Sequence, residues 1–145
     1  RVREGEALAE DIASKLDSMR LSVDAIENVA PDVVDEYRRK LTARITELLG
    51  SSVADMGRVA TEVALFADKC AVDEEISRLK AHIAAMRGYL KAEGPVGRKL
   101  DFLVQEMNRE ANTIGSKAND LRITEEVLKL KNDIEKIREQ AQNVE

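Results

Sequence analysis

A pair of carboxylates at helical spacing is the strongest chemical feature of this sequence. Glu106 and Glu110 stand four residues apart, so a helix would place their side chains next to each other. Two such carboxylates repel, and a bound cation would offset that repulsion. Carboxylate oxygens are preferred ligands of Mg²⁺ and Mn²⁺, which also bind waters and substrate phosphates. The pair therefore indicates chemistry that depends on a divalent cation, Mg²⁺ or Mn²⁺.

A second charged segment contains the only histidine of the chain. Glu75, Arg78 and His82 recur at steps of three and four residues, which places them on one face of a helix. Histidine is the side chain best suited to exchange protons near neutral pH. A lone histidine in a charged helix is also common as an ordinary surface residue, and the spacing leaves both interpretations open.

A polar stripe of uncommon composition lies beside the carboxylate pair. Its members are Arg98, Asp101, Gln105, Asn108 and Asn112. Asn is a poor helix former because its side chain competes for backbone hydrogen bonds. Two Asn on one helical face therefore favour a role in directional hydrogen bonding, which either a neighbouring helix or a ligand would satisfy.

Other common catalytic motifs are absent from the sequence. It has no phosphate-binding glycine loop, no dinucleotide fingerprint, no Cys/His zinc spacing and no serine-triad pattern. Cys70 is the only cysteine, so an intrachain disulfide is impossible, and its apolar neighbours predict a packing role. No signal peptide and no membrane-spanning run stand out, and a cytoplasmic location is the expectation.

The helix that must position the carboxylate pair is predicted at 97–117. Its apolar residues recur every three or four positions: Leu100, Leu103, Val104, Met107, Ala111 and Ile114. A last helix follows, with Asp120 or Thr124 as its cap, and it either starts after a break near Gly115 or continues the previous helix.

The first half of the chain predicts further long helices. Apolar residues at nearly heptad spacing indicate a helix over 4–29, and Pro31 opens a second helix over 31–49. Residues 1–50 are therefore predicted to form an antiparallel hairpin. A third helix is predicted from 52–57 to about Ala92.

Composition supports this all-α assignment. Aromatic residues make up 3 % of the chain and charged residues 35 %, which is typical of long helices and coiled coils. The net charge of −5 argues against an indiscriminate nucleic-acid binder. We predict about five helices, three of them long, in antiparallel hairpins that form a coiled-coil-like bundle. Its thin aliphatic seams also predict a homo-oligomer.

Four stretches of the sequence resemble a known family. They are REGEALAEDI (3–12), ALFADKCAVDEEISRLKAHI (64–83), GRKLDFLVQEMNREANTIGSK (97–117) and LKLKNDIEKIREQAQNVE (128–145). Together they closely resemble the C-terminal region of the bacterial YicC/YloC family, whose members are described as stress-induced proteins and as endoribonucleases. Such proteins are about twice this length and carry an N-terminal α/β domain. The resemblance thus implies that this domain is absent here, with 51–145 as the helical region carrying the family motif, and a ring-like hexamer for the full-length protein.

The resemblance also implies a function and roles for individual residues. The chain would be the C-terminal part of a divalent-metal-dependent endoribonuclease that acts on RNA phosphodiesters. Glu75, Glu106 and Glu110 would bind the metal or act as bases, and His82 would transfer protons. The residues expected to hold RNA phosphates, sugars or bases are Arg98, Lys99, Asn108, Arg109, Asn112 and Lys117.

A non-catalytic alternative remains open, namely a coiled-coil oligomerisation module whose polar stripe fixes helix register. Carboxylates that converge in an open cleft would favour the enzyme. Carboxylates that are each paired inside helix contacts would favour the module.

Overall fold

The computed structural model describes residues 2–50, 55–92 and 94–143, with side chains from Gly5 onward. Over these residues the chain is all-α and contains no strand, which confirms the predicted fold class. The helices are α1 (Val2–Leu49), α2 (Met56–Cys70), α3 (Asp73–Lys91), α4 (Gly97–Lys117) and α5 (Leu121–Ala141).

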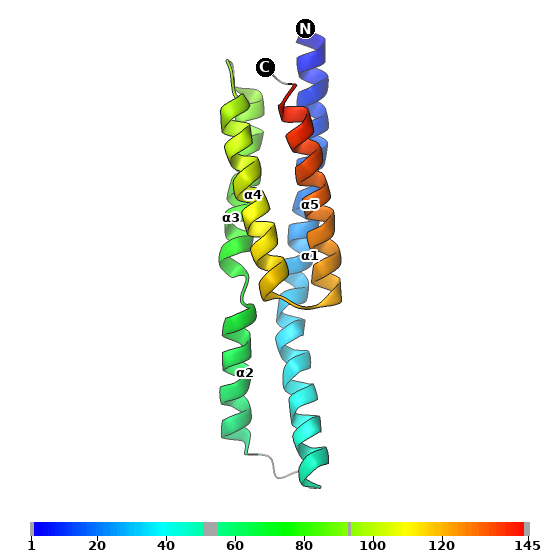
Figure 1. Cartoon of the computed structure of the whole chain (residues 1–145), viewed down its shortest axis with the longest axis vertical. Coiled ribbons are helices and arrows are strands. Elements are labelled where there is room, and N and C mark those ends of the chain that lie inside the picture. The colour runs from blue at the N-terminus through cyan, green and yellow to red at the C-terminus, as the bar shows by residue number, and fades with distance from the viewer. Residues whose placement is uncertain (1, 51–54, 93, 144–145) are drawn as a thin grey trace.

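The helices form an elongated bundle with two unequal parts (Figure 1). Helix α1 runs the full length, and α2 and α3 return alongside it, one after the other. Helices α4 and α5 form a second hairpin that packs on α3 and on the first half of α1. We call α3, α4, α5 and the first half of α1 the four-helix part, and residues 32–49 with α2 the two-helix arm.

The hairpin predicted within residues 1–50 is wrong, because α1 continues through Pro31. A proline inside a helix removes one backbone hydrogen bond and disfavours the helix. Here the apolar stripe continues without interruption, and Val29, Ala30 and Val33 pack against the core on both sides of the proline. This packing holds the helix together at Pro31, and the true antiparallel partner of the second half of α1 is α2.

The single long helix predicted up to Ala92 is also wrong, because it is two helices with a break at Ala71 and Val72. Ala71 is extended, with φ −64° and ψ 124°, and Val72 is buried. Three acidic residues, 73–75, occupy the first turn of α3, where negative charge suits the positive end of the helix dipole. Pro31 and this break line the same pocket, so they lie at one level of the bundle.

The two C-terminal helices agree with the sequence. Helix α4 has the predicted bounds, and all six residues of its predicted apolar stripe are buried. A break at 118–120 separates α4 from α5, and Asp120 caps α5 by accepting a hydrogen bond from the backbone N–H of Arg122 at 2.9 Å. The open question of a continuous helix is therefore settled in favour of two helices.

Two smaller expectations can also be compared with the structure. Cys70 is half-buried at the end of α2, and burial raises the pKa of its thiol, which suits a packing role. Within the described ranges, no helix has both the length and the apolar composition to cross a membrane.

Candidate active site between helices α3 and α4

The antiparallel packing of α3 on α4 brings three metal-ligating side chains together. One ligand atom from each of His82, Glu106 and Glu110 lies within 4.8 Å of the other two. Glu110 is buried, whereas His82 and Glu106 are half-buried. We call these three residues the His–Glu cluster. The carboxylate pair thus converges with the only histidine, although that histidine is 24 positions earlier in the sequence than Glu106.

The His–Glu cluster fits a divalent cation. Ligands about 2.1 Å from a Mg²⁺ ion lie about 3–4 Å from one another, so small side-chain rotations from the observed spacing would suffice. The Nε2 atom of His82 is buried and has no hydrogen-bond partner among the described residues. Such an unpaired polar atom is costly unless a ligand satisfies it. The donor set therefore suits an ion bound by two carboxylates and one imidazole.

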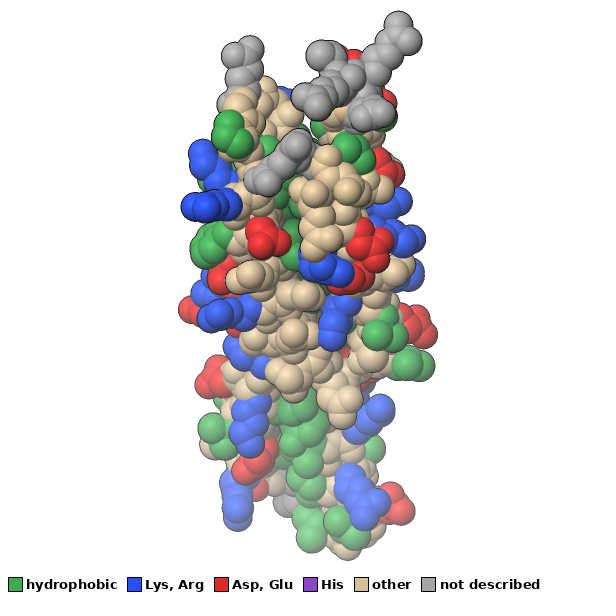
Figure 2. Space-filling model, turned by 45° about the horizontal axis from the view of Figure 1, so that its top comes forward, with side chains coloured by type: hydrophobic (Ala, Val, Ile, Leu, Met, Phe, Trp, Pro, Cys, Tyr) green, Lys and Arg blue, Asp and Glu red, His purple; other side chains and the backbone are tan. Residues whose placement is uncertain are grey.

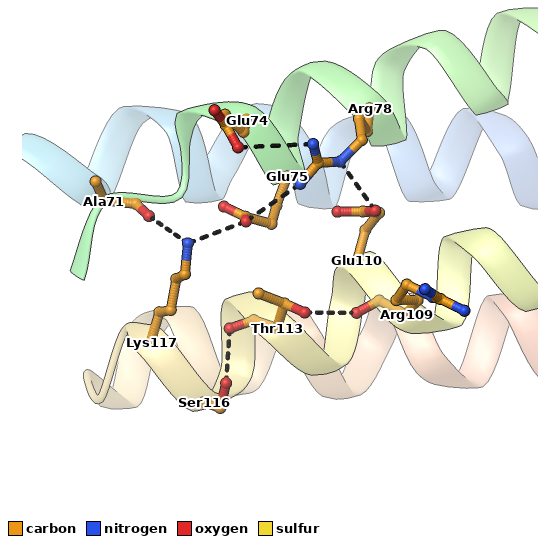
Figure 3. Close-up of polar contacts among 9 residues, drawn as sticks. All are labelled: Ala71, Glu74, Glu75, Arg78, Arg109, Glu110, Thr113, Ser116 and Lys117. Atoms are coloured by element: carbon orange, nitrogen blue, oxygen red, sulfur yellow. Dashed lines mark hydrogen bonds and ion pairs between the residues drawn. The ribbon is translucent and has the colours of Figure 1, made fainter. Parts of the chain in front are cut away.

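Glu75, a predicted metal ligand, lies outside the His–Glu cluster. Its side chain is 3 % exposed, and its Oε2 accepts a hydrogen bond from Lys117 Nζ at 3.1 Å and a longer one from Arg78 at 3.5 Å (Figure 3). Its Oε1 is buried without a hydrogen-bond partner among the described residues. Glu75 is therefore part of an ion-pair network beside the cluster.

Arg78 connects Glu75 with the His–Glu cluster, and the sequence interpretation gave it no role. Its Nε donates to Glu110 Oε1 at 3.0 Å, across the α3–α4 interface. The same guanidinium faces Glu75 and, at 3.6 Å, Glu74 (Figure 3). The pKa of Arg78 is raised, chiefly by this hydrogen bond to Glu110. Its spacing of three residues from Glu75 was the sequence signal for a contact on the same helix.

Lys117 holds the junction between α2 and α3. Its Nζ donates to the carbonyl oxygen of Ala71 at 3.4 Å as well as to Glu75 (Figure 3). The lysine thus satisfies one backbone carbonyl near the C-terminal end of α2. Its side chain is 38 % exposed, so this contact leaves part of the charge accessible to solvent.

The other predicted RNA-binding residues of α4 divide into two groups. Arg109 lies next to the His–Glu cluster, with its side chain 73 % exposed and its Nε 3.9 Å from Glu106. Arg98 and Lys99 lie about three turns before Arg109, roughly 15–17 Å along the helix axis at about 1.5 Å per residue. Arg98 lines a surface pocket of about 340 Å³, and the ammonium of Lys99 is 5.1 Å from the ring centre of Tyr89.

The polar stripe of α4 faces solvent. Arg98, Asp101, Gln105 and Asn112 are exposed and Asn108 is half-buried. A stripe with this exposure does not form a helix–helix contact within the described part of the chain. Its amides are accessible to a ligand or to another chain.

Comparison with known proteins identifies the family of the chain. A family model described as "Endoribonuclease YicC-like, C-terminal" matches residues 26–145. A Clostridioides difficile protein named "Probable endoribonuclease YicC" is 49 % identical over the whole chain, and a Haemophilus influenzae protein of the same name is 41 % identical. The chain spans about half the length of these relatives, at 50 % of each. We conclude that it belongs to the YicC-like family and matches the family's C-terminal region.

Proposed function

We propose that this chain is the C-terminal helical part of a divalent-metal-dependent endoribonuclease. The observation that carries the proposal is the His–Glu cluster, which joins two carboxylates and the imidazole of His82, whose buried Nε2 has no hydrogen-bond partner among the described residues. The names of the two relatives, which describe probable endoribonucleases, support the choice of RNA as substrate. A metal-dependent phosphodiester-cleaving site needs an ion, ligands that hold it and cations that bind phosphate.

The residues of the His–Glu cluster would have different roles in cleavage. Glu106 and Glu110 would hold the ion, and His82 would complete the donor set through its unpaired Nε2. A bound Mg²⁺ or Mn²⁺ supplies Lewis-acid stabilisation of a phosphoryl oxygen and lowers the pKa of a water molecule. In a state in which His82 does not ligate the ion, its imidazole would transfer the proton, because histidine is the side chain best suited to proton exchange near neutral pH.

Exposed residues on α4 would bind the RNA. Arg109 is close enough to Glu106 for only a long ion pair, so its guanidinium can turn toward a phosphate. Asn108 and Asn112 would contact sugar or base edges from the same helix. Arg98 and Lys99 would bind the backbone of the same RNA further along α4, because electrostatic contacts with phosphates do not require proximity to the cleaved bond.

One observation favours the non-catalytic alternative. The two buried glutamates, Glu75 and Glu110, are both paired with cations, as they would be in a structural helix contact. In that case the chain is a coiled-coil module, and the polar stripe and the arm form contacts in a homo-oligomer, for which the family resemblance suggests a hexamer. The two functions make different predictions for Glu106 and Glu110. In the enzyme these carboxylates are needed for cleavage, whereas in the module they only stabilise a helix contact.

The test replaces each carboxylate of the pair in a full-length YicC-like protein that carries this chain as its C-terminal half. Glu106→Gln and Glu110→Gln keep the side-chain size and remove the charge. We expect unchanged folding and mass but at least a tenfold loss of cleavage, or about 1.4 kcal/mol of barrier. Cleavage of a structured RNA is measured with Mg²⁺, with Mn²⁺ and with a chelator, and Glu125→Gln on the exposed side of α5 is the control.

Normal cleavage by both variants would make the pair structural and favour the oligomerisation module. Activity that survives the chelator would remove the metal from the proposal. Arg98→Ala or Lys99→Ala should weaken RNA binding and flatten its dependence on salt, because fewer counterions are released.

A further inference from the structure

Arg78 occupies a central position between the His–Glu cluster and the buried Glu75. We propose that Arg78 is a positioning residue, which holds the carboxylate of Glu110 toward His82 and Glu106 and thereby sets the affinity of the cluster for a divalent cation. This inference rests on the proposed function, because it assumes that the cluster binds a metal ion.

The geometry of the Arg78 side chain is restrained from three directions. Its Nε donates to Glu110 at 3.0 Å, and its terminal nitrogens lie 3.5 Å from Glu75 and 3.6 Å from Glu74. A guanidinium is planar and offers its donors in fixed directions, so these contacts together determine its orientation. An oriented donor in turn restrains the carboxylate of Glu110, which reaches it from the other helix.

Burial explains why Glu110 needs such a partner. Its side chain is 5 % exposed, whereas that of Arg78 is 49 % exposed. A charged carboxylate in an apolar contact is costly without a charge-assisted hydrogen bond. Arg78 supplies this bond on one side of the carboxylate, and His82 and Glu106 lie near it as well. Without Arg78, a rotation of Glu110 toward water would reduce the cost and would remove a ligand from the cluster.

A purely electrostatic role for Arg78 would have the opposite effect on metal binding. A positive charge next to a cation site repels the ion, so its removal should tighten binding. Positioning predicts weaker binding after the same change, because one of the three donors is no longer held in place. The sign of the change therefore distinguishes the two roles.

The experiment uses Mn²⁺ and the only histidine of the chain as its reporter. Mn²⁺ is paramagnetic and broadens the NMR signals of nearby protons, so the imidazole signals of His82 report binding at the cluster. We expect Arg78→Met to weaken Mn²⁺ binding at least tenfold. We expect Arg78→Lys, which keeps the charge but cannot contact Glu75 and Glu110 with one rigid fork, to weaken it about threefold.

The matched control is Arg87→Met on the same helix. Arg87 pairs with Asp17 of α1 at 2.6 Å, outside the His–Glu cluster, and its removal changes the net charge by the same amount. Mn²⁺ binding should stay within twofold of the parent chain. Circular dichroism and thermal unfolding monitor the fold of every variant.

The possible results separate the role of Arg78 from the existence of the metal site. Parent-like or tighter Mn²⁺ binding in folded Arg78→Met would overturn the positioning role and leave the metal site intact. If Arg78→Met does not fold, Arg78→Lys decides, and parent-like binding there would equally overturn the role. Absence of His82 broadening in the parent chain would overturn the metal site itself, and with it this inference.

Discussion

Helix α1 is packed differently in its two halves. In the four-helix part the core-facing residues of its apolar stripe are fully buried, including Leu16, Met19 and Ile26, each with 0 % of its surface exposed. In the two-helix arm the equivalent residues, such as Tyr37, Leu41 and Ile45, are only half-buried. The apolar stripe is similar in both halves, but the first half contacts α3 and α5 and the second half contacts α2. Burial therefore depends on the number of partner helices as well as on the stripe.

Several large apolar side chains are exposed at the end of the arm. Leu48, Leu49 and Met56 are 71 %, 62 % and 62 % exposed, and the arm is held internally by the stacked rings of Tyr37 and Phe66, 3.9 Å apart. Figure 2 shows a column of hydrophobic side chains at the lower end of the molecule, flanked by Lys, Arg, Asp and Glu side chains. The homo-oligomer predicted from the sequence remains a prediction, and the end of the arm offers apolar side chains for such a contact.

The largest difference between the two parts should appear when a leucine is shortened. Leu130→Ala in α5 removes a fully buried side chain from the four-helix part and should destabilise the chain by about 3–5 kcal/mol. Leu41→Ala in the arm should cost roughly 1 kcal/mol, because solvent already reaches the site. Urea denaturation at several protein concentrations measures both values. Equal costs, or a Leu41→Ala cost that rises with concentration, would show that another chain covers the arm.

A smaller effect of opposite sign is expected at the boundary between the parts. Pro31→Ala restores a backbone hydrogen bond within α1 and should stabilise the helix by about 1–3 kcal/mol. Hydrogen exchange should slow mainly in residues 32–49, because the arm depends on α1 for its attachment. The control is Pro95→Ala, since Pro95 lies outside the helices and its replacement restores no helical hydrogen bond. Faster exchange in the arm of Pro31→Ala would contradict this account.

The two aspartate caps provide a matched pair with one member in each part. Asp120 caps α5, and Asp55 caps α2 by accepting from the N–H groups of Gly57 and Arg58. Asp120→Ala should cost about 1–2 kcal/mol. Asp55→Ala should cost roughly 0.5 kcal/mol in global unfolding, because the arm can open locally first. Thermal and urea unfolding measure both, and the reverse order would contradict the assignment of lower stability to the arm.

The contribution of Asp120 should also depend on pH. The hydrogen bond from Arg122 holds the pKa of the Asp120 carboxyl below its usual range. A lowered folded pKa stabilises the chain above the unfolded value of about 4, and the stabilisation is lost as the pH falls through the folded value. The stability difference between the parent and Asp120→Ala should therefore shrink in acid. A difference that grows below about pH 4 would be inconsistent with the ion pair.

The smallest effects concern two glycines in the four-helix part. A Cβ added at Gly88 meets nothing within 4 Å, so Gly88→Ala should stabilise α3 by about 0.5–1 kcal/mol. A Cβ at Gly115 would approach Val127 Cγ1 to 3.3 Å, so Gly115→Ala should gain less or lose stability. Thermal unfolding of both variants measures the two changes in stability. An equal gain in stability would show that the Val127 side chain can shift away from the added methyl group at little cost.

Local signals were sufficient for the C-terminal helices. The apolar stripe of α4 and the capping aspartate of α5 lie within single segments, so a helix and its bounds could be read from them. The same local signals were misleading further upstream. Pro31 indicated a helix boundary that packing on the core overrides, and the break at Ala71 and Val72 contains neither Gly nor Pro. There the buried Val72 and the contact of Lys117 with Ala71 come from outside the segment.

In the candidate site, too, neighbours within one helix could be predicted from the sequence, whereas neighbours on different helices could not. Spacing in the sequence was enough to place Glu106 beside Glu110, and Glu75 on one face with His82, because a helix fixes such neighbours. It could not specify which residue of one helix meets which residue of the other. That register depends on how the buried side chains of α3 and α4 interlock across their interface, among them Leu79 and Met107. The packing of these two helices placed His82 rather than Glu75 beside the carboxylate pair. It also placed Arg78 where its guanidinium contacts both Glu75 and Glu110.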